Sequence, residues 1–166
     1  CTQIASTVAE AKFFCWQSDD GLAQPGALAQ CIKLFEDHLN EKDAICLRYI
    51  EGDKPQDFHD LYWTAWYHDS LRLKFIPNSY NIAPLGMYDL SWFRNIGGLD
   101  TKWEHINMCT HDLAFRLQNA GGTICPSPSI VSKFIWSWIG DDSGPVKDAF
   151  FNNDLDLMTR EWDENE

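Results

Sequence analysis

Apolar positions change spacing several times along the chain, and each spacing predicts an element. The apolar run KFFCW, residues 12–16, is too short for a helix and predicts a buried strand. Pro25 then fits the first position of a helix. One face of that helix is expected to pack inward through residues at helical spacing: Leu28, Ile32, Phe35 and Leu39. Residues 44–50 predict a second strand, so the order strand, helix, strand indicates a βαβ unit with parallel pairing.

The next patterned stretch predicts another strand followed by a short helix. Residues 82–87 fit a strand, but Pro84 interrupts it, which favours an edge or a bulge. Asp89 is expected to cap a helix over residues 90–96, and Gly97 to end that helix in a left-handed turn.

The last clear helix is expected after Thr110, which we predict as its N-cap, and before Gly121, which we predict as its stop. Its buried face is predicted to carry Leu113, Leu117 and Ala120. Strands are expected through Ile124 and over residues 130–138. Residues 53–72 carry clustered aromatic side chains without a clean period, and we interpret them as an insertion over the sheet.

Composition fits one domain over residues 1–166, with 45% hydrophobic residues, eight Trp and ten Phe. No apolar run reaches the roughly 18 residues that a membrane span needs. Residues 1–12 show neither a basic segment nor an apolar segment of a secretory signal, and the sequence lacks an initiator Met.

The formal charge of −12 argues against nucleic acid and anionic lipid as partners, since both carry negative charge. A phosphorylated substrate would need local help from a cation. The six cysteines form no C-x-x-C pair, and Cys15, Cys31 and Cys46 lie among apolar residues. We therefore expect a reduced, cytoplasmic protein, although an even number of cysteines leaves disulfides open.

Three segments carry a family resemblance. They are FFCWQSDDGLAQPGAL (13–28), FRNIGGLDTKWEHINMCTHDLAFRLQNAGG (93–122) and the weaker GPVKDAFFNNDLDLMTREW (144–162). In this order they resemble the second half of a family 2 glycosyltransferase with the GT-A fold. The resemblance implies an α/β fold in which a mixed sheet is flanked by helices, here incomplete.

The resemblance also implies a reaction. A sugar would pass from a nucleotide-diphosphate donor, a UDP- or GDP-sugar, to a hydroxyl acceptor in one inverting step. Mn²⁺ or Mg²⁺ would neutralise the charge that gathers on the leaving diphosphate, and Asp oxygens suit such an ion. A carboxylate base would take the proton of the attacking hydroxyl.

Residue by residue, Asp19 matches an acid of the family's metal motif, and Asp20 is the acidic residue beside it. Gln17 stands where many relatives have the first acid of that motif. Asp112 matches the general base, and His111 precedes it where relatives commonly have an acid.

Three residues match the family's Gly-Gly-x-Asp loop, which lies near the sugar in relatives: Gly97, Gly98 and Asp100. Many relatives also have a late metal-binding His. This chain has no His after His111, and Lys147 or Asp148 stands in that region instead.

Simpler interpretations stay open beside these roles. Asp19 and Asp20 also fit a turn with acids at a helix start, and Asp112 fits an acid in a first helical turn. His111 fits a surface or capping residue, and Gly97 with Gly98 fits a plain helix stop. A sugar-stacking platform or ordinary core would explain four aromatic residues: Tyr62, Trp63, Trp66 and Tyr67.

The nucleotide-binding half of the family needs roughly 100 residues, whereas only about ten precede the first strand. We therefore expect a fragment with weak or no activity alone, whose uncovered sheet edge a homodimer would cover. One rival is a nucleotidyltransferase, which would need a basic phosphate loop near its start. The other is a non-catalytic glycan-binding or scaffolding domain of GT-A ancestry, which Gln17 and His111 favour.

Overall fold

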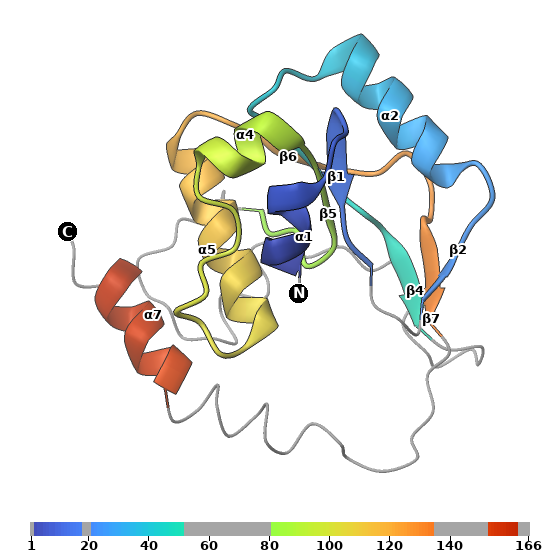
Figure 1. Ribbon diagram of the computed structural model, residues 1–166. Coiled ribbons are helices and arrows are strands. Elements are labelled where there is room, and N and C mark those ends of the chain that lie inside the picture. The colour runs from blue at the N-terminus through green and yellow to red at the C-terminus, as the bar shows by residue number, and fades with distance from the viewer. Residues whose placement is uncertain (1, 18–20, 52–80, 135–152, 163–166) are drawn as a thin grey trace.

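The computed structural model describes residues 2–17, 21–51, 81–134 and 153–162 (Figure 1). Its helices are α1 (Thr2–Val8), α2 (Ala27–His38), α4 (Leu90–Asn95), α5 (Ile106–Asn119) and α7 (Leu155–Trp162). Its strands are β1 (Phe13–Cys15), β2 (Gly21–Ala23), β3 (Ala44–Cys46), β4 (Tyr49–Glu51), β5 (Gly86–Asp89), β6 (Ile124–Pro126) and β7 (Ser132–Phe134).

The strands form two mixed sheets. The larger has the order β1-β5-β3-β6, with β5 antiparallel to both of its neighbours and β3 parallel to β6. The smaller has the order β2-β7-β4, with β7 antiparallel to β2 and parallel to β4. The expected α/β class with mixed sheets and flanking helices is confirmed.

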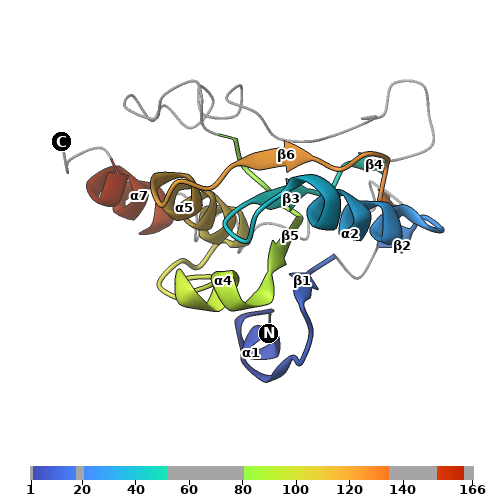
Figure 2. The ribbon, with the colours of Figure 1, turned by 90° about the horizontal axis from the view of Figure 1, so that it is seen from above.

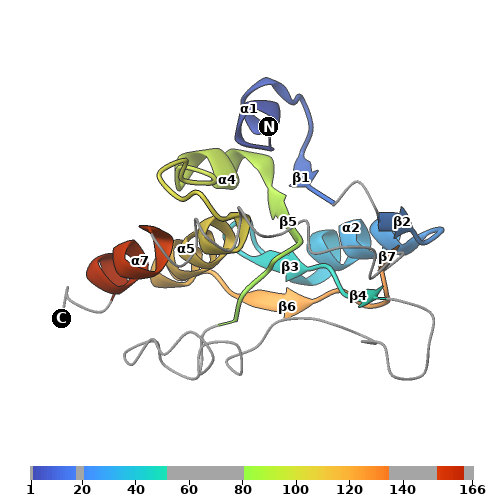
Figure 3. The same cartoon turned by 90° about the horizontal axis from the view of Figure 1, so that it is seen from below.

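Helices cover both faces of the larger sheet because its side chains alternate between two cores. Ile45 packs with Cys31 and Phe35 of α2 in one core. Ala44, its neighbour on β3, packs with Leu113 of α5 in the other core, which also takes in side chains of α4 and α7. Figures 2 and 3 show α2 on one side of the sheet and α4, α5 and α7 on the other.

A buried carboxylate fixes the register between β3 and β6. Asp43 is 4% exposed, and its Oδ1 accepts hydrogen bonds from the backbone N–H and the hydroxyl of Thr123, both at 2.8 Å. Its Oδ2 accepts the N–H of Asn40 at 2.9 Å. The two hydrogen bonds to Thr123 therefore connect the loop that precedes β3 with the loop that precedes β6.

The described cysteines are free thiols, and Cys31 and Cys46 are buried as expected. Cys15 is half-buried. Burial raises the pKa of the Cys31 thiol to about 11, with further contributions from Cys15 and Cys125. The Cys31 thiol therefore stays protonated near neutral pH.

Several expectations for the first half are wrong in detail. Helix α2 begins at Ala27 after a left-handed Gly26 (φ 75°), so Pro25 lies before the helix. Ile32 is 38% exposed, since the helix buries the stripe that Ala27 and Cys31 share instead. Residues 44–50 do not form one strand, because β3 and β4 belong to different sheets. Strands β1 and β3 run parallel, but β5 lies between them.

In the second half, the predicted cap at Asp89 and the predicted helix stops at Gly97 and Gly121 are confirmed. The side chain of Asp89 accepts the N–H of Trp92 at 3.0 Å, and Gly97 (φ 92°) and Gly121 (φ 86°) are left-handed. Strand β6 (Ile124–Pro126) includes Ile124, as expected. The strand predicted over residues 82–87 is wrong in position, since β5 follows Pro84 and lies inside the sheet.

Thr110 is not the N-cap of α5, because the helix begins four residues earlier, at Ile106. The two residues just before the helix are bound from far along the chain. Buried Asp154 accepts the N–H groups of Glu104 and His105 at 3.1 and 2.6 Å. Leu113 and Leu117 are buried as expected, but Ala120 is exposed.

The aromatic stretch 53–72 with Tyr62, Trp63, Trp66 and Tyr67, and the region of Lys147 and Asp148, lie outside the described residues. Within the described ranges, no helix combines the length and the apolar character that crossing a membrane requires.

Replacing Asp43 with Ala removes two hydrogen bonds between the loops before β3 and β6, and a third within the loop before β3. We expect Asp43→Ala to lower the free energy of unfolding by about 3 kcal/mol in urea denaturation, because the Thr123 hydroxyl, the Thr123 N–H and the Asn40 N–H lose their charged acceptor. Glu41→Ala, at an exposed position of the same loop, should change the free energy of unfolding little. Equal stability of the two variants would contradict this role of Asp43.

Candidate functional site

A buried ion pair on α5 lies at the centre of the candidate site. The Asp112 side chain is 3% exposed, and its Oδ2 accepts Arg116 Nε at 2.9 Å and Nη2 at 2.8 Å. The two residues are four apart, which brings their side chains to one face of the helix. Arg116 therefore both neutralises and orients the Asp112 carboxylate.

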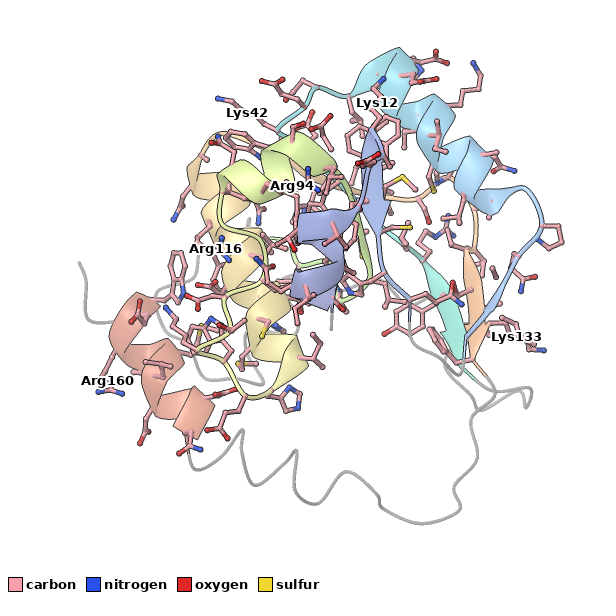
Figure 4. The ribbon with its side chains drawn as sticks, viewed as in Figure 1. Lys12, Lys42, Arg94, Arg116, Lys133 and Arg160 are labelled. Atoms are coloured by element: carbon pink, nitrogen blue, oxygen red, sulfur yellow. The ribbon has the colours of Figure 1, made fainter. Side chains whose placement is uncertain are left out.

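The same guanidinium holds the loop that follows α4. Arg116 donates to the carbonyl of Ile96, and its Nη2 donates to the carbonyl of Gly98 at 2.7 Å. Figure 4 shows Arg116 on α5, on the side of the molecule that carries α1 and α4. The predicted base and the Gly-Gly loop are thus linked through one side chain.

Both loop glycines have left-handed backbones that disfavour other residues, with φ 92° at Gly97 and φ 61° at Gly98. A Cβ on Gly98 would also lie 2.4 Å from Gln3 Oε1 and 2.9 Å from the Phe93 ring. Gln3 Oε1 accepts the Leu99 N–H at 2.7 Å, and Gln3 Nε2 donates to the Gly97 carbonyl at 3.3 Å. Helix α1 therefore packs directly on this loop.

A hollow of about 350 Å³ opens beside the loop. The described residues that line it are Gln3, Ile96, Gly97, Leu99, Asp100, Thr101 and Arg116. Among them, the charged side chains are Asp100 and Arg116, which carry opposite signs. This volume is at the small end of ligand sites, and the lining combines apolar groups with donors and acceptors.

Asp100 is the carboxylate that a ligand in the hollow can reach, since its side chain is 41% exposed. It accepts the N–H of Lys102 at 3.0 Å and the Lys102 ammonium at 3.3 Å. Partial burial acts to raise the pKa of the Asp100 carboxyl, but these hydrogen bonds and the charges of Lys102 and Arg116 outweigh it, so the pKa is lowered. Asp100 is therefore ionised at neutral pH.

Lys102 ties this loop to α7. Its ammonium also lies 3.1 Å from Glu161 Oε2 and 4.9 Å from the centre of the Trp103 ring. Partial burial acts to lower the pKa of Lys102, but the hydrogen bond to Glu161 and the charges of Asp112 and Asp100 raise it overall. The cation stays charged beside Asp100.

His111 is 1% exposed and lies inside α5, with its ring 6.4 Å from that of Phe115. The expectation of a surface or capping residue is therefore wrong, because the helix starts earlier than its local sequence indicates. Asp112 is likewise not in the first turn of the helix. Its role as a base stays a prediction.

The predicted metal ligand Asp19 and its neighbour Asp20 lie outside the described residues. Gln17, which stands at the position of the first acid, donates its side-chain amide to the carbonyl of Gly21. In the part of the chain that the structure describes, no three His, Cys, Asp or Glu side chains gather closely enough to hold a metal ion. The metal site stays a prediction.

Two residues of this site were missed in the sequence. Arg116 could have been found, since an Asp and an Arg four residues apart on a helix commonly pair. Gln3 could not, because residues 2–8 lack acids in the first turn and basic residues in the last turn. Only tertiary contacts bring α1 to the loop.

The chain matches no model of a known protein family, and a search of curated proteins also finds no match.

Arg116→Met should destabilise the protein by about 3 kcal/mol in urea unfolding, because the buried Asp112 carboxylate loses its partner. The double variant Asp112→Leu/Arg116→Met should recover part of this loss, since it leaves no unpaired buried charge. Lys33→Met breaks an exposed pair of the same spacing with Asp37 and should have a much smaller effect. A double variant less stable than Arg116→Met would contradict the buried pair.

Proposed function

We propose that this chain forms the acceptor-side part of a glycosyltransferase that resembles family 2, with a GT-A-like fold. It would transfer a sugar from a UDP- or GDP-sugar to a hydroxyl acceptor with inversion. The observation that carries this proposal is the link through Arg116 between Asp112 and the Gly97–Gly98 loop. Of the residues that the resemblance singled out, Gly97 and Asp100 line the hollow, and Arg116, which also lines it, pairs with Asp112.

The chemistry of the hollow favours a neutral sugar. Ile96 and Leu99 offer apolar surface to the C–H face of a sugar ring, while Asp100 can accept from its hydroxyl groups. A phosphate would meet the negative charge of Asp100 in a protein whose formal charge is already −12. We therefore propose that the acceptor sugar, and not the diphosphate of the donor, occupies the hollow.

Asp112 is the proposed base. Both contacts from Arg116 end on Oδ2, so Oδ1 lies outside the ion pair. As the acceptor oxygen attacks the anomeric carbon, its proton would pass to Oδ1 and the nucleoside diphosphate would leave from the opposite face. Asp112 is not part of the lining of the hollow, so a sugar would contact Asp100 first.

Asp19, with Asp20 beside it, is the proposed holder of Mn²⁺ or Mg²⁺, and the bound ion would offset the charge of the leaving diphosphate. The free thiols among the described cysteines support a reducing, cytoplasmic setting.

A glycan-binding domain without catalysis is the second candidate. It is favoured by the burial of Asp112 in an ion pair, which holds that carboxylate away from solvent. Such a domain would use Asp100 and the loop for binding and would need no base.

The base assignment predicts a loss of turnover. In the full-length protein, Asp112→Asn should lower kcat by about 10²–10⁴, measured as release of nucleoside diphosphate from UDP- and GDP-hexoses with a panel of hydroxyl acceptors. Asp37→Asn, on the exposed side of α2, is the control. If the wild-type protein binds glycans without turnover, and Asp112→Asn binds them with the same affinity, the second candidate would be supported instead.

The metal assignment predicts a separate defect. Asp19→Ala should raise the Mn²⁺ concentration needed for half-maximal activity by about tenfold or more, since a hard oxygen ligand is lost. Asp112→Asn should leave that concentration unchanged. Activity that persists after chelation in the wild-type protein would exclude a metal role for Asp19.

A further inference from the structure

We propose that Gln3 of α1 is a specificity-determining residue for a neutral sugar in the hollow beside the Gly97–Gly98 loop. This inference rests on the proposed function and adds a residue from a helix that the resemblance does not include. Under this proposal, α1 forms one side of the sugar-binding site.

The hydrogen-bonding capacity of the Gln3 amide is only half used in the described structure. Oε1 accepts the Leu99 N–H, and Nε2 donates to the Gly97 carbonyl. A carboxamide has two N–H groups and two oxygen lone pairs. One donor and one acceptor therefore remain, on a side chain that lines the hollow.

Helix α1 is fixed firmly enough to hold that amide in place. Arg94 of α4 donates to the carbonyls of Ser6 at 2.8 Å and Ala9 at 2.6 Å, and Figure 4 shows it beside α1. Ser6 is 1% exposed, and its hydroxyl donates to the Gln3 carbonyl at 2.7 Å. The amide is thus positioned before a ligand arrives, which favours selective recognition.

The remaining groups of the hollow define the class of ligand. Ionised Asp100 only accepts hydrogen bonds, and Arg116 only donates them. Within the described ranges, Arg116 already uses four of its five N–H groups on Asp112, Ile96 and Gly98. Gln3 offers both a donor and an acceptor, which suits a hydroxyl group because a hydroxyl also donates and accepts. The site therefore fits a neutral hexose, whose epimers differ in where one hydroxyl points.

The test titrates methyl glucoside, methyl galactoside and methyl mannoside into the ¹⁵N-labelled chain and follows the amide signals of Gly97, Gly98 and Leu99. We expect the wild-type chain to prefer one epimer. Gln3→Met keeps the length of the side chain and removes its hydrogen bonds. It should therefore lower the affinity for that epimer by about tenfold and the affinity for the other two by less. Ile4→Ala, at a 71% exposed position of α1, should leave all three affinities unchanged.

The pattern across epimers separates recognition from support of the loop. If Gln3 only supports the loop, Gln3→Met would weaken the binding of all three glycosides by the same factor and keep the order of their affinities. That result would overturn the proposal, and so would affinities that do not change. If Gln3→Met loses its folded spectrum, Gln3→Glu serves instead. The Glu side chain keeps an acceptor for the Leu99 N–H but cannot donate to a hydroxyl group. This variant should therefore also reduce the differences in affinity among the three epimers.

Failure of this inference differs from failure of the proposed function. If the Gln3 variants keep the wild-type preference for one epimer, Gln3 does not take part in sugar recognition. That result would not contradict the proposed glycosyl transfer. If the wild-type chain binds none of the three glycosides, this inference falls, whereas the proposed glycosyl transfer is decided by the turnover of the full-length protein.

Discussion

The guanidinium of Arg116 is the interaction on which the site depends. It neutralises the buried Asp112 carboxylate and binds the carbonyls of Ile96 and Gly98, so one side chain sets the distance between α5 and the loop after α4. A buried ion pair is costly to desolvate, and it is stable only when further hydrogen bonds satisfy the charges. Here the loop carbonyls supply those bonds. Without this arrangement, neither Asp100 nor the hollow would have a defined position.

The loop itself is held between two helices that are far apart in the sequence. Arg116 reaches it from α5, and Gln3 reaches it from α1 through the N–H of Leu99 and the carbonyl of Gly97. The close approach of Gln3 requires glycine at position 98. The Gly-Gly pair is thus more than a helix stop, because its backbone is the surface on which the two helices meet.

Local chemistry in the sequence predicted the cap of α4 and the glycine stops after α4 and α5, but it misplaced the starts of α2 and α5 and predicted sheet order poorly. The cap at Asp89 and the left-handed glycines were predictable because each depends on neighbours within four residues. The interior position of β5 and the split of residues 44–50 between two sheets depend on long-range pairing, which no local pattern encodes. For the site, the resemblance indicated Asp112 and the loop, whereas Gln3 emerges only from tertiary contacts. The proposed metal acids lie outside the described residues.

The capping of α5 by Asp154 has a consequence for biosynthesis. This carboxylate lies 50 residues after Glu104, one of the two residues whose N–H groups it accepts. On the ribosome, the turn that leads into the helix of Asp112 and Arg116 therefore emerges with the N–H groups of Glu104 and His105 unmet, and they gain this partner only after a further stretch of chain is made. The turn that leads into α5 therefore gains its final hydrogen bonds only after residue 154 has been made.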